Sequence, residues 1–208
     1  MDGLSAGAQI ALRDAARTQV RAEAWRFGIV PAHARAPIER FISSAYARVY
    51  GARIPTFMPH LAALHRDDEL FAACGLRCGE GERLFLETYL DEAVEERLAT
   101  VTGAPQARRS LYEIGNLAIG RPGAARALIA LLTEYLLERD ARWVVFTAVP
   151  MLRNNFRRLG IPLHVLGHAD PARLTPEARE QWGSYYDHMP QVSAVRVADS
   201  AAALRRAR

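Results

Sequence analysis

The chain has 208 residues, a formal net charge of +4 and hydrophobic residues at half of its positions, a composition typical of a soluble globular protein with one main domain. All 27 basic residues are arginine, and their excess over acidic residues lies near the two ends. No basic groove is indicated, so we expect no nucleic acid as a partner. No apolar run is long enough to cross a bilayer and the first residues do not resemble a secretion signal. We therefore expect a cytoplasmic protein without stable membrane insertion.

The ends of the chain are predicted to lie outside one central domain. Residues 1–35 are rich in Ala and Arg, with apolar side chains too sparse for a continuous stripe, and predict a partly ordered tail. Residues 36–198 form the predicted domain, and residues 199–208 a basic tail. Within the domain, residues 38–50 show helical spacing, and two strand-like runs at 56–65 and 70–78 flank a charged turn at 66–69, which predicts a hairpin.

From residue 84 onward, predicted helices and strands alternate. The helices are expected near 84–98, 122–139, 150–156 and 175–182, and the strands at 111–119, 142–147, 163–167 and 191–197. A hairpin followed by alternating elements predicts an α/β (α+β) fold around one mixed sheet. Cys74 and Cys78 are expected to be free thiols, and the spacing of the histidines gives no metal signature. We therefore expect no metal and no tightly bound cofactor.

The strand at 111–119 carries polar residues where burial is expected. Glu113 and Asn116 would point to opposite sheet faces in a regular strand, but a bulge at Gly115 would bring them to one face. A buried carboxylate and amide are costly to desolvate, which favours a ligand site. The alternative interpretation is a structural Glu–Arg pair beside a hydrogen-bonded Asn.

The turn that follows this strand resembles a phosphate-binding segment. Gly120 and the Pro122–Gly123 pair end the strand and lead into a helical pattern. The N–H groups and dipole at a helix N-terminus attract anions. Small residues at Gly123, Ala124 and Ala125 allow close approach, and Arg121 and Arg126 add positive charge.

The acidic stretch between residues 80 and 96 is most simply a solvated helix face. Glu87 and Asp91 are four residues apart, so that together they could attract a cationic substrate or an arginine.

Several blocks of the chain resemble the thermostable hemolysin family. They are 75–80 (GLRCGE), 84–91 (LFLETYLD), 113–118 (EIGNLA), 143–148 (WVVFTA), 152–154 (LRN), 158–160 (RLG) and 182–187 (WGSYYD), and they span about residues 38–195 in order. That family looks related to the GNAT acyltransferase superfamily and, more distantly, to acyl-homoserine-lactone synthases.

This resemblance implies a GNAT-like, mostly antiparallel mixed sheet with helices on both faces. It also implies an N-acyltransferase that moves an acyl group from acyl-CoA or an acyl carrier protein to a small amine acceptor such as an amino acid. The pantetheine arm of CoA or of the carrier protein would lie in the gap between strands 111–119 and 142–147. The thioester is thus a co-substrate, expected to contact Leu117, Ala118, Ile119, Arg121, Gly123, Ala124, Ala125 and Arg126.

The expected roles divide among a few residues. Glu113 is the predicted general base, because burial would raise its pKa towards the working range. Asn116 is predicted to position the acceptor or the thioester carbonyl. Further substrate contacts are expected from Glu87, Phe146, Thr147 and Asn154.

Two further interpretations of the sequence remain open. Phe156 lies four residues before Gly160, where many enzymes of the superfamily have a tyrosine that protonates the thiolate. A binding module that has kept the fold without the chemistry would fit this difference. The family name also admits a membrane-active hemolysin or lipid-binding protein, although no strongly amphipathic, apolar-rich helix is apparent.

Overall fold

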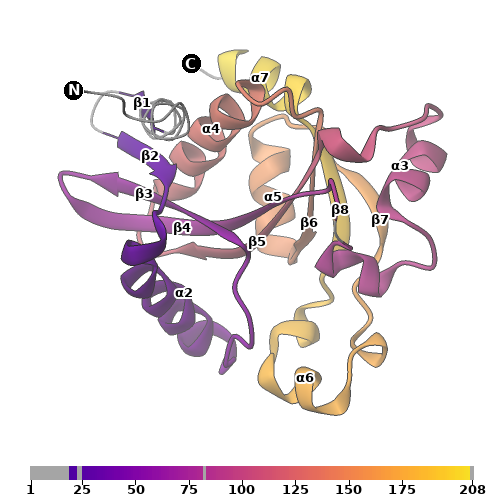
Figure 1. Cartoon of the computed structure of the whole chain (residues 1–208), viewed down its shortest axis with the longest axis horizontal. Coiled ribbons are helices and arrows are strands. Elements are labelled where there is room, and N and C mark those ends of the chain that lie inside the picture. Colours follow the sequence, from indigo (N-terminus) through magenta and orange to yellow (C-terminus); the bar gives the residue numbers. More distant parts are fainter. Residues whose placement is uncertain (1–18, 23–24, 82, 207–208) are drawn as a thin grey trace, which may run out of the picture.

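A computed structural model of the chain describes residues 19–22, 25–81 and 83–206. Its described strands form one eight-stranded sheet in the order β1-β2-β3-β4-β5-β6-β8-β7 (Figure 1). The strands are β1 (Gln19–Ala22), β2 (Trp25–Ile29), β3 (His60–Arg66), β4 (Glu69–Cys78), β5 (Leu111–Ile119), β6 (Trp143–Ala148), β7 (His164–His168) and β8 (Gln191–Arg196). Neighbours pair antiparallel except β5 with β6, which pair parallel. The predicted mixed, mostly antiparallel sheet is confirmed.

Helices cover both faces of this sheet. The α-helices in the described part of the chain are α2 (Arg35–Tyr50), α3 (Val94–Thr102), α4 (Ala124–Leu137), α5 (Pro150–Arg158), α6 (Pro176–Gln181) and α7 (Val197–Arg206). Helices α4, α5 and α7 pack on one face, called here the α4 face. Helices α2 and α3 pack on the opposite face, called the α2 face. In Figure 1, α4 and α7 lie together above the sheet and α2 lies below it.

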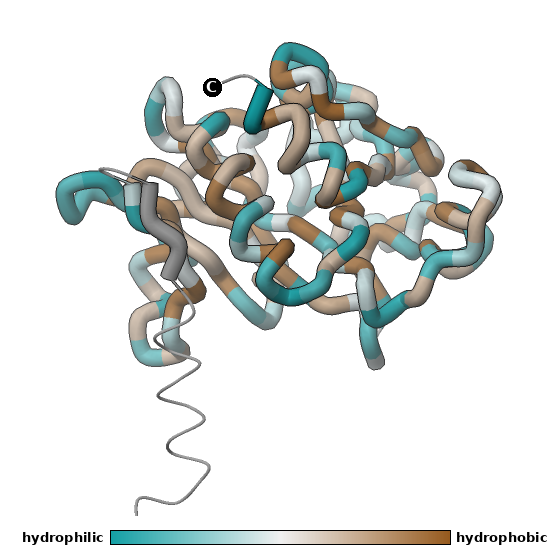
Figure 2. The backbone as a smooth tube through the Cα atoms, turned by 90° about the horizontal axis from the view of Figure 1, so that it is seen from above, coloured by the Kyte–Doolittle hydropathy of each residue, from teal (hydrophilic) through white to brown (hydrophobic). Residues whose placement is uncertain are grey.

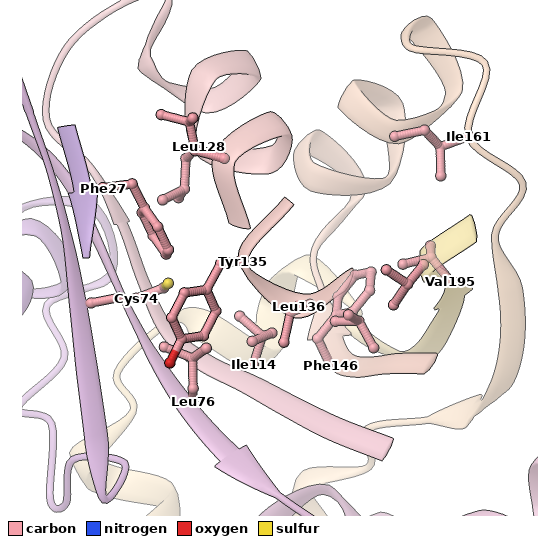
Figure 3. Packing of buried hydrophobic residues seen from close by; sticks show 14 of the residues in the cluster. Phe27, Cys74, Leu76, Ile114, Leu128, Tyr135, Leu136, Phe146, Ile161 and Val195 are labelled. Atoms are coloured by element: carbon pink, nitrogen blue, oxygen red, sulfur yellow. The ribbon is translucent and has the colours of Figure 1, made fainter. Parts of the chain in front are cut away.

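The core on the α4 face joins the two halves of the sheet. Buried side chains from β2, β4, β5, β6 and β8 meet those of α4 in one cluster, and Figure 3 shows Phe27, Cys74, Ile114, Leu136 and Phe146 within it. Burying one such large side chain contributes roughly 1.5–3 kcal/mol. In Figure 2 the backbone changes repeatedly between hydrophobic and hydrophilic residues along its length. The two cysteines are both free thiols, as predicted.

The turn between β3 and β4 is shorter than predicted. It consists of Asp67 and Asp68 alone, whose φ angles of 50° and 64° place both in the left-handed region. Two such residues make the hairpin turn whose twist matches the flanking strands, and aspartate tolerates this conformation better than most residues. The charged turn was therefore identified correctly, and its flanking residues belong to the strands.

Segments near both ends of the chain, which the sequence predicted to be tails outside the central domain, pack into the fold. Strand β2 pairs with β3, and Phe27 within it is fully buried. At the other end α7 buries Ala203 and Leu204. A five-residue strand gains its stability from a distant partner, and a helix that packs through alanines has a weak hydrophobic pattern, so neither element stands out locally. Residues 1–18 and 207–208 lie outside the described part of the chain.

The predicted continuous helix near 84–98 is divided in the structure. Residues Phe85–Tyr89 form a short 3₁₀ helix, η2, and α3 begins only at Val94. The side chain of Glu87 accepts hydrogen bonds from the N–H groups of Leu84 and Val94. It thereby satisfies N–H groups at the starts of both helical segments, which N-terminal residues of helices otherwise leave unpaired.

Candidate functional site

Strands β5 and β6 pair over only four residues and then separate. Leu111–Ile114 of β5 lie opposite Trp143–Phe146 of β6, while the next part of β5 continues along β4 alone and β6 continues along β8. A cavity of about 380 Å³ lies at this separation and is lined by residues from both faces of the sheet. An extended ligand placed there would meet one strand edge that lacks a partner strand.

A bulge in β5 shapes the edge of the gap. Gly75 and Ala73 of β4 pair with Gly115 and Ala118 of β5, so β5 has one more residue than β4 between these pairs. Asn116 lies at this bulge with a φ of 49°, in the left-handed region that Asn tolerates. The extra residue reverses the alternation of side chains. Glu113 and Asn116 therefore lie on the same face, the α2 face, as the sequence predicted.

The amide of Asn116 is engaged at both ends. Its Oδ1 accepts a hydrogen bond from the Met58 N–H at 2.8 Å, and its Nδ2 donates to the Thr56 carbonyl at 3.4 Å. Residues 56–58 in turn line the cavity. The hydrogen-bonded Asn of the alternative interpretation is thus the arrangement observed, and Asn116 acts as a positioning residue for this loop.

Two paired glycines make room for the loop. Gly75 and Gly115 lie opposite each other on β4 and β5. A Cβ atom at either position would approach side-chain atoms of Met58 to 2.5 Å, closer than van der Waals contact allows. The close approach of Met58 to the strands explains why both positions are glycine.

Glu113 is the buried carboxylate of the cavity. Glu113 is only 2% exposed, and its carboxylate accepts hydrogen bonds from the N–H groups of Phe85 at 3.0 Å and Leu86 at 2.8 Å. Burial raises the pKa of Glu113, although these two hydrogen bonds and the positive charge of Arg77 oppose the shift. Among the described residues no ion pair includes Glu113. A buried carboxylate with a raised pKa at a cavity wall is suited to accept a proton.

Glu87, which the sequence predicted to contact the substrate, does not line the cavity. Its two carboxylate oxygens accept hydrogen bonds from the Arg108 guanidinium at 2.6 and 2.9 Å, and Glu95 also pairs with Arg108. Burial alone would raise the pKa of Glu87, but hydrogen bonds from Arg108 and two backbone N–H groups outweigh it and lower the pKa. The sequence identified an acid that attracts an arginine, and the structure shows that this arginine is internal.

On the α4 face, the cavity wall is apolar. Phe146 and Phe156 stack with their ring centroids 5.1 Å apart, and Leu117 of β5 lies in the same wall. Helix α4 adds Leu128, Ile129 and Leu132, and α5 adds Leu152. This wall is complementary to a hydrocarbon chain. Phe146, predicted to contact the substrate, lies in this wall. Asn154, predicted for the same role, is exposed on α5, accepts a hydrogen bond from Arg157 and does not line the cavity.

On the α2 face, the cavity wall is aromatic and carries hydroxyl groups, which the sequence analysis missed. Tyr46 comes from α2 and Tyr89 from η2, while Trp182, Tyr185 and Tyr186 follow α6. Burial raises the pKa values of the tyrosines, so their hydroxyls are protonated at neutral pH. Thr147 of β6, predicted to contact the substrate, also lines the cavity, and its carbonyl accepts a hydrogen bond from the Tyr185 hydroxyl. The block Trp-Gly-Ser-Tyr-Tyr-Asp was the available signal for these tyrosines.

The segment after β5 has the predicted strand–turn–helix layout. Gly123, with a φ of 83°, precedes α4, which begins at Ala124 rather than at Pro122, and no side chain caps the helix. Arg121 is exposed, pairs with Glu69 and lies over the Phe71 ring. Of the other residues predicted to contact the thioester, Leu117 lines the cavity. Ala118 packs toward α2, Ile119 packs on the α4 face, Ala124 is buried, Ala125 is partly buried and Arg126 is exposed.

The fold and the geometry of this site define a class of protein. A bulged strand that parts from its parallel neighbour and is followed by a turn and an uncapped helix is the arrangement of the GNAT-like fold. The chain belongs to the thermostable hemolysin family, whose model matches residues 30–201. No curated protein matches the sequence.

Solved structures of the same fold include enzymes that handle acyl groups. FeeM, an N-acyl amino acid synthase from uncultured soil microbes, matches with a TM-score of 0.57 and 16% identity over 85% of this chain and 92% of its own. The acyl-homoserine-lactone synthase LasI matches with a TM-score of 0.59 and 13% identity over 86% and 93%. The CoA-dependent acyl-homoserine-lactone synthase BjaI, solved with SAM and isopentyl-CoA, matches with a TM-score of 0.54 and 14% identity. The match covers 86% of this chain and 87% of BjaI. At these identities the likeness establishes a shared fold.

The described residues contain no helix long and apolar enough to cross a membrane. They also contain no group of three or more His, Cys, Asp or Glu side chains placed to hold a metal ion.

Proposed function

We propose that this protein is an acyltransferase that moves an acyl group from the thioester of CoA or an acyl carrier protein to the nitrogen of an amine. The observation that carries the proposal is the position of Glu113, a buried carboxylate with a raised pKa at the point where β5 and β6 part. The solved enzymes of this fold named above support the same chemistry.

In the proposed reaction, the amine nitrogen attacks the thioester carbonyl carbon and loses a proton to Glu113, directly or through one water. Holding both reactants in one cavity supplies the proximity that aminolysis needs. The carbonyl oxygen becomes an oxyanion, which N–H groups freed by the bulge at Asn116 can stabilise. The carbon–sulfur bond then breaks, an amide is formed, and the thiolate takes up a proton.

The source of that last proton is part of the proposal. Phe156 has no proton to give, but the cavity holds four protonated tyrosine hydroxyls. We assign protonation of the leaving thiolate to this group of tyrosines or to water they hold. The proposed reaction therefore does not need a hydroxyl at position 156.

The two ends of the donor are assigned to opposite parts of the site. The acyl chain lies along the apolar wall of Phe146, Phe156 and α4. The phosphate groups of the donor lie at the N-terminus of α4, where Gly123 and Ala125 offer N–H groups and Arg121 and Arg126 add charge. The pantetheine arm runs between them along the edge of β5, as an added strand would.

The test is thiol release from a panel of acyl-CoA and acyl-carrier-protein thioesters with and without amine acceptors, with mass spectrometry of the amide. We expect release that depends on an acceptor and an amide as product. Binding of CoA by calorimetry without turnover would point instead to a binding module. Lysis of red cells by the purified protein without any thioester would favour a membrane-active protein.

A further inference from the structure

One charged group on the α2 face has no role in the reaction as described so far. Arg77 of β4 lies directly opposite Glu113 of β5 in the strand register, and both residues line the cavity. The Nε atom of Arg77 is buried and has no hydrogen-bond partner. In the described part of the chain, no other buried side-chain nitrogen or oxygen lacks a hydrogen-bond partner.

A second arginine lies next to it. Arg83 lines the same cavity, and its backbone carbonyl accepts a hydrogen bond from Arg77 Nη1 at 3.2 Å. Arg83 Nη2 donates to the Glu87 carbonyl at 3.1 Å. Neither arginine takes part in any ion pair within 4.0 Å among the described residues. Two arginines thus lie at one cavity wall, and no carboxylate of the described residues is bound to either.

An unpaired buried donor on a charged group is costly, commonly by about 1–3 kcal/mol or more. Native structures keep few such groups, and those kept usually serve a ligand. A guanidinium presents several N–H donors in a planar arrangement that fits a carboxylate at two points. The ligand that would satisfy Arg77 is therefore an anion with carboxylate-like geometry.

We infer that the acceptor is an α-amino acid, with its carboxylate bound by Arg77 and Arg83 and its amine directed at Glu113. This inference rests on the proposed function and names the acceptor class and the residues that select it. Facing residues on neighbouring antiparallel strands have Cβ atoms roughly 5 Å apart. Arg77 and Glu113 are such a facing pair, so a positively and a negatively charged side chain begin side by side at this cavity wall.

Arg77 has another role to be separated from this one. Its charge lowers the pKa of Glu113 against the effect of burial. If that were its whole role, removing the charge would slow every acceptor alike and move the pH profile. A role in binding the carboxylate predicts a loss confined to acceptors that carry one.

The experiment compares matched acceptors in wild type, Arg77→Gln and Arg83→Gln, with Arg40→Gln on the exposed side of α2 as the control. With one acyl thioester, kcat/KM is measured for phenylalanine, for phenylalanine amide and for 2-phenylethylamine. We expect wild type to prefer phenylalanine. Arg77→Gln should lower kcat/KM for phenylalanine by on the order of 10- to 100-fold, the value of a charged hydrogen bond, and leave 2-phenylethylamine within about 3-fold. Arg83→Gln should also lower kcat/KM for phenylalanine more than for 2-phenylethylamine, but by a smaller factor. Arg40→Gln should change neither value.

Binding measured without turnover keeps the two proposals distinct. Calorimetry compares N-dodecanoylphenylalanine with N-dodecanoyl-2-phenylethylamine on wild type and Arg77→Gln. A preference for the carboxylate that Arg77→Gln abolishes supports the inference. Equal losses for all acceptors, or a wild type that prefers 2-phenylethylamine, overturn the inference and leave the proposed function standing. Absence of thiol release with every acceptor overturns the proposed function, whatever the binding shows.

Discussion

Two buried glutamates, one within η2 and one bonded to its backbone, differ in almost every physical respect. Glu87, within η2, is paired with Arg108 and bonded to two N–H groups, and its pKa is lowered. Glu113, on β5, accepts hydrogen bonds from two N–H groups of η2 but has no ion-pair partner within 4.0 Å among the described residues. Its pKa is raised. Only Glu113 lines the cavity.

The difference teaches that burial alone does not mark a functional carboxylate. Both residues are almost fully buried, at 4% and 2% exposure. A carboxylate whose lone pairs are filled by a bidentate arginine stabilises the fold, whereas one held only by backbone N–H groups beside a cavity keeps the capacity to exchange a proton. The two sites can be tested against each other.

The largest effect is expected from Glu113→Gln. Because the amide cannot accept the proton of the attacking amine, kcat should fall by on the order of 10²–10⁴, with little change in the KM for thioester. Steady-state kinetics with saturating acceptor measure both values. The exposed Glu177→Gln on α6 is the control and should behave as wild type. Near-normal turnover in Glu113→Gln would show that the amine reacts without this base.

A loss of stability rather than of catalysis is expected from Glu87→Gln. The change leaves Arg108 without its bidentate partner and should lower the free energy of unfolding by about 3 kcal/mol, as breaking a buried ion pair does. Urea unfolding measures this loss, and kcat in the folded fraction should stay near wild type. A double-mutant cycle with Arg108→Met should give a positive coupling between the two residues. Lower kcat with unchanged stability would reverse the contrast between the two glutamates.

A smaller effect is expected at the proposed phosphate-binding turn. Arg121→Ala should raise the KM for the thioester by about 3- to 10-fold and leave kcat nearly unchanged, since an exposed charge contributes modestly to binding. Arg158→Ala, an exposed arginine on α5, is the control. The effect should shrink at high salt. A loss in kcat without a change in KM would place the phosphates elsewhere.

The subtlest difference is in pH dependence. The contribution of Glu87 to the free energy of unfolding is present above the ordinary pKa of a glutamate and is lost as pH falls through its lowered pKa. For Glu113 the sign is opposite: its contribution is present below the ordinary pKa and is lost as pH rises through its raised pKa. Wild type should therefore lose stability relative to Glu113→Gln as pH rises, and gain stability relative to Glu87→Gln.

The same titration should be visible in turnover. Because Glu113 works as a base only when deprotonated, kcat/KM should rise with pH through its raised pKa and then level off. Unfolding at a series of pH values and the pH profile of kcat/KM measure the two effects. Parallel stability profiles for the two variants would contradict the opposite pKa shifts.

The sequence by itself determined much of the centre of the molecule. The strand Leu111–Ile119 was predicted with the bounds observed, because its apolar run ends at a glycine-containing turn. The bulge and the unusual position of Glu113 could also be predicted. A carboxylate and a glycine are both uncommon inside an apolar strand, so each marks an irregular position. These signals lie within about ten consecutive residues.

Only the tertiary structure decided which polar residues face the cavity. Arg108 and Glu87 are 21 residues apart and Arg77 and Glu113 are 36 apart in the chain, so sequence spacing does not reveal which arginine neutralises which acid. The tyrosine wall likewise gathers residues from α2, η2 and the segment after α6. The pKa of a buried group depends on every charge and hydrogen bond within a few ångströms, and strand pairing, not chain order, sets those neighbours. For the same reason the short β2 strand and the alanine-rich α7 helix became recognisable only when packed against their partners.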